Sequence, residues 1–138
     1  MEETTNSTPT NAGRNKRVLC IEDEQFISEM YARALNKAGY NVAVELDGGA
    51  GLKAAQTNQF DIILLDLMVP TMTGIEILRR LRNPAETPKL KAKIIVTTNL
   101  EQREDIRADI EKQADGYVVK TELTPRELVD FLDHIDIG

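Results

Sequence analysis

The sequence predicts an α/β fold in which helices cover both faces of a parallel β-sheet. Short apolar runs alternate with segments whose apolar residues recur at helical spacing, which is typical of βαβ units. The run at 62–65 is apolar at every position before Asp66, and such runs are buried on both faces of a sheet. The length of the chain accommodates five strand–helix pairs.

The first strand–helix pair is predicted from the amphipathic pattern after residue 17. A strand over 17–21 is followed by a helix from about 24 to 38, and Gly39 provides its stop. A second strand is expected at 41–44. The helix has one apolar face, made of Ile27, Met30, Tyr31, Ala34 and Leu35.

Two further helices flank the third strand. The DGGAG turn at 47–51 leads into a helix that ends at Gln56, and 62–66 forms the strand. A helix over 74–81 ends before the loop 83–93, because the two prolines in that loop cannot continue it.

The last two strands are expected at 94–97 and 117–120, each followed by a helix. The first of these helices covers 101–113, and the second runs from 124 to 135. The opening TPRE at 124–127 combines an N-cap Thr, a Pro in the first turn and a capping-box Glu. The second helix should cover the sheet with Leu128, Phe131, Leu132 and Ile135.

Composition and charge fit a single folded unit and exclude some functions. The chain has 138 residues, 41% of them hydrophobic, and a net charge of -6. Direct nucleic-acid binding is not expected, because a phosphate footprint needs clustered Lys and Arg. No run is long enough to span a bilayer, so we expect no membrane association and a cytoplasmic location. The lone Cys20, inside an apolar run, is predicted to be a core residue.

The first 16 residues differ in composition from the rest. They are rich in Thr, Asn, Ser, Pro and Gly and hold too few apolar residues to order themselves. We therefore expect a disordered polar tail at 1–16 and one domain at 17–138.

Acidic residues end two of the predicted strands. Glu22 and Asp23 follow the first strand, and Asp66 ends the third. In a doubly wound sheet of order 2-1-3-4-5 these strands flank the point where ligands bind. Like charges so close together repel unless a cation lies between them, and Mg²⁺ prefers carboxylate oxygens. The alternative is that acids such as Asp23 only cap the following helix.

A hydroxyl and an amine end the other two strands of interest. The fourth strand ends at Thr97 and Thr98, and the fifth ends at Lys120. Together with the acids, they form a set of groups suited to a divalent metal and a phosphoryl group.

Four segments carry a family resemblance. VLCIEDE, IILLDLMVPTMTGIEIL, IIVTTN and ADGYVVK resemble, in order and spacing, the signature of the receiver domain of bacterial two-component response regulators. The resemblance covers 17–135. It implies a flavodoxin-like (βα)5 three-layer sandwich.

The resemblance also implies roles for the acids. Asp66 would be the phosphoacceptor for a histidine kinase. Asp23 and Asp66 would ligate Mg²⁺ directly, Glu22 through water, and Met68 through its backbone carbonyl.

Three further residues would respond to the phosphoryl group. Lys120 would pair with its oxygens, and Thr98 would hydrogen-bond to it. Tyr117 would follow Thr98 and change the surface formed by 101–113, 117–120 and 124–135. Alternative roles stay open: Tyr117 as an ordinary edge-strand aromatic, Thr98 as a helix cap, and Thr97 in place of Thr98.

The chain departs from the family pattern at three places. Thr121 stands where the family usually has a Pro preceded by a cis bond, which leaves the geometry of the Lys120–Thr121 bond and the reach of Lys120 open. Asn99 replaces a small residue. Met68 and Leu100 are apolar where fast-cycling members often carry polar groups. We therefore expect slow dephosphorylation.

The function implied is that of a stand-alone response regulator. Its partners would be a histidine kinase or histidine phosphotransfer protein and an unidentified output protein, and it would not act as an enzyme on other substrates. The alternatives are an adaptor that works without phosphorylation and an aspartyl-nucleophile phosphatase, although Met68 occupies the place of the second acid that a phosphatase needs. The apolar pair Ile106 and Ile110 fits either a homodimer or packing against the sheet.

Overall fold

The structure, a computed structural model, describes residues 15–135. The polar tail predicted at 1–16 lies almost entirely outside the described residues, so it stays a prediction.

The described residues form alternating strands and helices. In chain order the elements are β2 (Arg17–Ile21), α1 (Gln25–Lys37), β3 (Asn41–Glu45), α2 (Gly48–Gln56), β4 (Ile62–Asp66), α3 (Gly74–Leu81), β5 (Lys93–Thr98), α4 (Glu104–Gln113), β6 (Gly116–Val119), a 3-10 turn η2 (Lys120–Glu122) and α5 (Pro125–Asp133).

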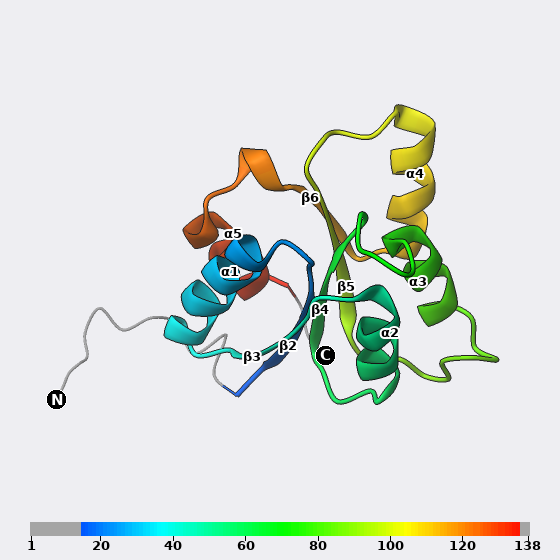
Figure 1. The fold of residues 1–138 in the computed structure, drawn as a ribbon, viewed down its shortest axis with the longest axis horizontal. Helices are drawn as coiled ribbons and strands as arrows, with labels where there is room; N and C mark the ends of the chain where they lie inside the picture. Colours follow the sequence, from blue (N-terminus) through cyan, green and yellow to red (C-terminus); the bar gives the residue numbers. More distant parts are fainter. Residues whose placement is uncertain (1–14, 136–138) are drawn as a thin grey trace, which may run out of the picture.

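The strands form one parallel sheet in the order β3-β2-β4-β5-β6. Helices α1 and α5 cover one face, and α2, α3 and α4 cover the other (Figure 1). The predicted three-layer sandwich and its 2-1-3-4-5 strand order are therefore confirmed. The winding reverses between β2 and β4, and in doubly wound sheets ligands bind beyond the carboxyl ends of the strands at such a point.

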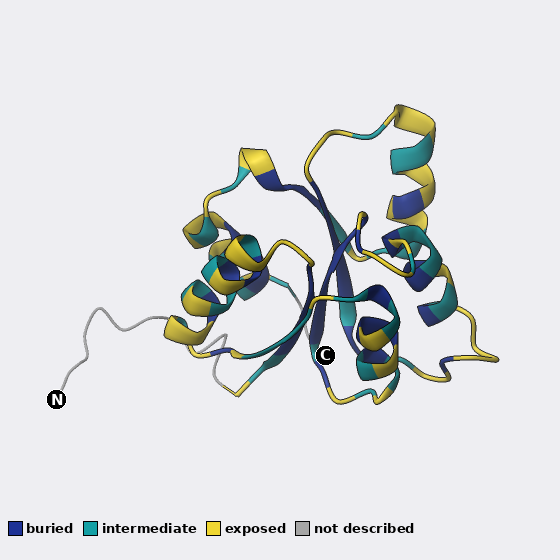
Figure 2. Ribbon diagram, in the orientation of Figure 1, coloured by how far each residue is buried: buried dark blue, intermediate teal, exposed yellow. Residues whose placement is uncertain are grey.

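The core is divided between the two faces of the sheet. Along β2, Leu19 and Ile21 pack toward α2 and α3, whereas Val18 and Cys20 pack toward α1 and α5. Every residue of β4 is buried, and the central strands β2, β4 and β5 are the most buried part of the fold (Figure 2). The prediction that Cys20 is a core residue is confirmed, because it is 1% exposed.

Helix α4 begins three residues later than the sequence predicts. Residues 101–103 remain in the preceding loop, where the backbone N–H of Gln102 donates to the hydroxyl of Tyr117 at 3.0 Å. This tertiary contact holds residue 102 in the loop, and the pattern of the helical segment alone does not show it. Ile110 is buried and Ile106 packs against the core, so the apolar face of α4 lies on the sheet within one chain.

The end of the chain differs from prediction in two details. Lys120 opens the turn η2 instead of ending a strand, and α5 ends at Asp133 instead of 135. Leu128 and Leu132 are buried as expected, but Phe131 is 37% exposed. Its ring lies over the backbone of Gly116, where a Cβ would approach it to 3.1 Å. None of the helices in residues 15–135 has the length and apolar character that crossing a membrane requires.

Candidate functional site

Three charged side chains project from the strand ends to the same side of the sheet. Glu22, Asp66 and Lys120 each lie two residues beyond a core residue of the α1 and α5 face, namely Cys20, Leu64 and Val118. Because side chains in a strand alternate with a period of two, these charged groups continue that face. They reach the edge of the sheet where the winding reverses.

Lys120 joins the two buried acids. Its Nζ lies 2.6 Å from Oε1 of Glu22 and 3.2 Å from Oδ2 of Asp66. All three side chains are at most 4% exposed. The peptide bonds of the described residues are all trans, including that between Lys120 and Thr121, and Lys120 reaches both acids in this geometry.

Backbone N–H groups hold the second oxygen of each acid. The N–H of Met68 donates to Oδ1 of Asp66 at 3.1 Å, and that of Glu24 donates to Oε2 of Glu22 at 3.1 Å. Oδ1 of Asp66 therefore lies on the side of the β4–α3 loop, where the Met68 side chain is exposed. Oδ2 lies against the buried Lys120.

Gly74 allows α3 to approach the backbone of Asp66. A Cβ at this position would overlap the carbonyl oxygen of Asp66 and lie 2.6 Å from Cα of Leu67. The N–H of Gly74 donates to the carbonyl of Leu67 at 2.9 Å. The first residue of α3 thus fixes the end of β4.

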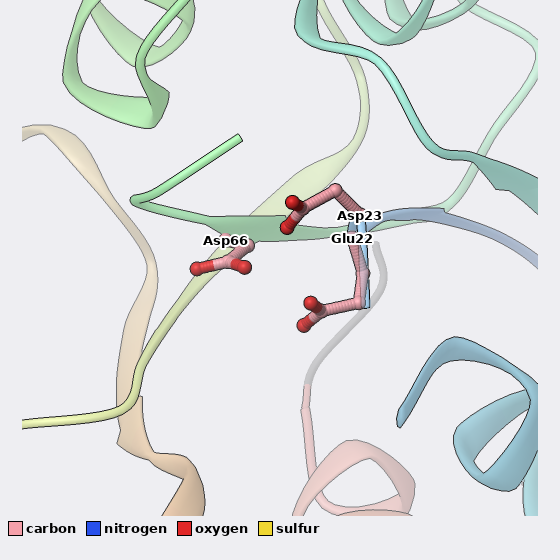
Figure 3. Close-up of side chains that lie close together, drawn as sticks. All are labelled: Glu22, Asp23 and Asp66. Carbon is pink, nitrogen blue, oxygen red and sulfur yellow. The ribbon is translucent and has the colours of Figure 1, made fainter. Parts of the chain in front are cut away.

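The acids form a group that fits a hard divalent cation. Glu22, Asp23 and Asp66 each offer a carboxylate oxygen, and these atoms lie within 4.8 Å of one another (Figure 3). Asp23 is exposed, and the N-cap of α1 is Glu24, with no side-chain cap. Asp23 therefore does not cap α1, and its carboxylate faces the other two. Oxygen donors with water access on one side match Mg²⁺.

Burial and neighbouring charges shift the pKa values of Glu22 and Lys120. Burial raises the pKa of Glu22 to about 7, against the hydrogen bond from Lys120, and the Asp66 charge adds to the rise. Burial alone would lower the pKa of Lys120, but the hydrogen bond from Lys120 to Glu22 and the charge of Asp66 outweigh it, so that pKa is raised. Lys120 therefore stays charged, and Glu22 is the group of the pair that titrates near neutral pH.

The predicted switch residues lie apart from the acids. Thr98 ends β5 on the opposite face, because it continues the alternation of Ile94 and Val96, which pack in the core beside α3 and α4. Its hydroxyl donates to the carbonyl of Leu100 at 2.9 Å and accepts from the side chain of Gln102 at 3.2 Å. The structure therefore brings Glu22, Asp23, Asp66 and Lys120 together, while the hydroxyl of Thr98 bonds within its own loop and does not cap α4.

Gln102 is a residue of this region that sequence reasoning missed. Its side chain bonds the hydroxyl of Thr98 and its backbone N–H bonds the hydroxyl of Tyr117, so one residue contacts both expected switch side chains. The only signal in the sequence is that Gln102 lies four residues after Thr98. In the predicted helix over 101–113, Gln102 would have been an ordinary surface residue.

Tyr117 lies between the β5–α4 loop and α4. Its hydroxyl donates to Glu101 at 3.1 Å, and the guanidinium of Arg107 lies 4.5 Å from its ring centroid. Burial and the hydrogen bond to Glu101 raise the pKa of Tyr117. The half-buried ring on edge strand β6 is thus tied to the loop that carries Gln102.

A doubly wound sheet with clustered acids and a lysine at its switch point defines a class of α/β proteins with a candidate phosphoryl and metal site. Residues 18–133 match the model of the response regulator receiver domain family. The chain belongs to this family.

Known proteins of the same family are similar over most of the chain. Response regulator ArlR of Staphylococcus saprophyticus is 38% identical over 104 residues, which cover 75% of this chain and 45% of ArlR. The chain thus spans less than half the length of this curated relative. Chemotaxis protein CheY4 of Vibrio cholerae superimposes with a TM-score of 0.74 and 29% identity, covering 88% of this chain and 99% of that one. The receiver domain of Francisella response regulator 1452 gives a TM-score of 0.75 and 25% identity, covering 86% and 94%.

Proposed function

We propose that Asp66 accepts a phosphoryl group from a histidine kinase or a histidine phosphotransfer protein. The observation that carries this proposal is the buried Asp66 carboxylate, held between Lys120 and the Met68 N–H and grouped with two further acids. A carboxylate with a purely structural role needs only a partner for its charge. Asp66 instead lies among two further acids, which suit a cation, and a lysine, which suits a phosphoryl group.

The transfer is a displacement at phosphorus. An oxygen of Asp66 forms a bond to phosphorus as the bond between phosphorus and the donor imidazole nitrogen breaks, and the electron pair of that bond returns to the imidazole. Lys120 is placed to turn from Asp66 toward the phosphoryl oxygens and offset their charge. The product is an aspartyl phosphate on Asp66.

We assign Mg²⁺ as the cofactor of this site. Asp23 and Asp66 would hold it directly, Glu22 through water, and the Met68 carbonyl would complete the protein ligands. When bound, the ion offsets negative charge on the carboxylates and the phosphoryl group.

The output surface is formed by α4, β6 and α5. In this proposal Thr98 leaves its bonds with Leu100 and Gln102 for the phosphoryl group, and Tyr117 then moves away from the loop. An output protein in the cytoplasm reads the change by binding this surface, without direct contact of the domain with DNA. Whether a second copy also binds there stays a prediction.

The chain catalyses only its own phosphorylation and a slow dephosphorylation. Met68 and Leu100 are 72% and 74% exposed, and neither side chain carries a strong hydrogen-bonding group that could orient an attacking water. The phosphorylated state should therefore last for minutes or longer.

The test is to incubate the purified protein with Mg²⁺ and acetyl phosphate and to weigh the intact chain beside an Asp66→Ala variant. We expect the wild type alone to gain one phosphoryl group, and EDTA to prevent the gain. If neither acetyl phosphate nor a phosphorylated kinase modifies the wild type, the adaptor that works without phosphorylation becomes the better description. Turnover of a chromogenic phosphate ester would instead indicate a phosphatase.

A further inference from the structure

A second threonine lies directly beside the Asp66 carboxylate. Asp66 of β4 pairs in register with Thr97 of β5. Neighbouring strands are about 4.8 Å apart, and side chains in register on parallel strands project to the same face. The side chain of Thr97 is therefore the neighbour of Asp66 across the sheet.

Alternation along β5 separates the two threonines. Ile95 belongs to the core beneath α1 and α5, and Thr97 lies two residues further on the same face. Thr98 continues the opposite face, toward α4. Thr97 thus shares its face with Glu22, Asp66 and Lys120, and Thr98 does not.

The hydroxyl of Thr97 makes no hydrogen bond with any residue in 15–135, although only 3% of the residue is exposed. The other two buried threonines in this range are fully engaged: Thr87 bonds Arg80 and Gln56, and Thr98 bonds Leu100 and Gln102. A buried hydroxyl without a partner lowers stability, and a Val of the same shape would avoid this cost. The hydroxyl therefore calls for a role in another state of the site.

We propose that Thr97 is a positioning residue for Asp66. When Lys120 turns from Oδ2 of Asp66 to the incoming phosphoryl group, the hydroxyl of Thr97 donates to Oδ2 in its place. This inference rests on the proposed phosphorylation of Asp66 and adds a second threonine to it.

The two oxygens of Asp66 are placed for this division of roles. Oδ1 lies on the side of the exposed β4–α3 loop, where a phosphodonor can approach, and it accepts from Met68. Oδ2 has Lys120 as its donor on the buried side. With Thr97 on Oδ2, the plane of the carboxyl group stays fixed while Oδ1 bonds to phosphorus, and Oδ2 remains as the carbonyl oxygen of the aspartyl phosphate.

The test compares Thr97→Val, which removes the hydroxyl, with Thr97→Ser, which keeps it. Phosphorylation by acetyl phosphate with saturating Mg²⁺ is followed by intact mass over a range of donor concentrations. We expect Thr97→Val to lower the maximal rate constant about tenfold, the effect of one lost hydrogen bond in the transition state, with little change in the donor concentration at half-maximal rate. Thr97→Ser should stay within about threefold of the wild type.

Thermal unfolding separates positioning from a structural role. Because the hydroxyl is unpaired, Thr97→Val should keep or raise the Tm while it slows phosphorylation. Thr87→Val is the matched control: it removes a bonded buried hydroxyl far from Asp66, and should lower the Tm without slowing phosphorylation.

Three outcomes would overturn the inference about Thr97. They are a Thr97→Val variant that reacts at the wild-type rate, a Thr97→Ser variant that is as slow as Thr97→Val, and a Thr97→Val variant whose loss of rate follows a loss of Tm. A wild type that gains no phosphoryl group at all would instead overturn the proposed function, and the inference with it.

Discussion

The ammonium of Lys120 lies closer to Glu22 than to Asp66, at 2.6 Å against 3.2 Å. Lys120 is thus shared between a residue that we expect to hold Mg²⁺ through water and the expected phosphoacceptor. The shorter bond to Glu22 lets Lys120 leave Asp66 without losing both partners. The charge that balances the resting site is therefore already placed for the proposed phosphoryl transfer.

Removal of Lys120 should destabilise the resting protein. Lys120→Met leaves two buried carboxylates facing each other without a cation, and breaking a buried pair in this way costs about 3 to 5 kcal/mol. Urea unfolding in EDTA measures the loss. The control Lys91→Met, which breaks a more exposed pair with Asp61, should cost less than about 1 kcal/mol. Equal losses in the two variants would show that Lys120 does not balance the acids.

Stability without metal should fall as the pH rises toward neutrality. The pKa of Glu22 is about 7 in the fold against its ordinary value of 4.5, so the folded state binds this proton more tightly than the unfolded chain. The resulting stability is fully present below pH 4.5 and is lost as the pH rises through 7, with a size on the order of 3 kcal/mol. Lys120 does not titrate in this window, because its pKa is raised from 10.5.

The Glu22→Gln variant checks the origin of this pH dependence. Gln keeps a hydrogen-bond acceptor for Lys120 and has no proton to lose. Urea unfolding from about pH 5 to pH 8 in EDTA should show a decline for the wild type and a flatter profile for the variant. The same slope in both proteins would assign the decline to another group.

The side chain of Gln102 should restrain the switch. Gln102→Ala removes the bonds to the Thr98 hydroxyl and the Leu100 carbonyl, so less has to be broken before Thr98 turns to the phosphoryl group. If the lost hydrogen bonds stabilise the resting loop by about 1 kcal/mol net, their removal should raise the rate of phosphorylation by acetyl phosphate roughly fivefold. The control Gln25→Ala removes a surface bond to Glu29 on α1 and should have no effect. A slower Gln102→Ala protein would show that Gln102 supports the reactive geometry instead.

A polar side chain at position 68 should shorten the life of the phosphorylated state. Met68→Gln adds hydrogen-bonding groups on the open side of Asp66, where a water can be oriented toward phosphorus. Loss of the phosphoryl mass after removal of the donor should be several times faster than in the wild type. The exposed Phe26→Gln on α1 is a matched control for surface polarity and should leave the rate unchanged. A wild-type half-life of seconds would contradict the role given to Met68 and Leu100.

The sequence was sufficient for the layers and the acids at the strand ends, because local patterns determine both, whereas the strand order came from the family resemblance. The alternation of apolar strands with helices fixed the layers, and the acids follow strands whose position the apolar runs define. The predicted start of α4 was wrong because Gln102 is held in the loop by bonds to Thr98 and to Tyr117, a residue in a later strand, and a local pattern does not show these contacts. Alternation along one strand already puts Thr97 and Thr98 on different faces. Which of them lies beside Asp66 depends on the register between β4 and β5, which one strand read alone does not supply.

The close packing of α3 against Asp66 determines on which side of the site the structure can move. With Gly74 against the backbone of Asp66 and Leu67, that flank has no room to yield. The opposite flank, the loop from 99 to 103, is held mainly by hydrogen bonds of Thr98, Gln102 and Tyr117. A phosphoryl group on Asp66 would therefore displace the loop from 99 to 103, on the side of α4 and β6, and would leave α3 in place.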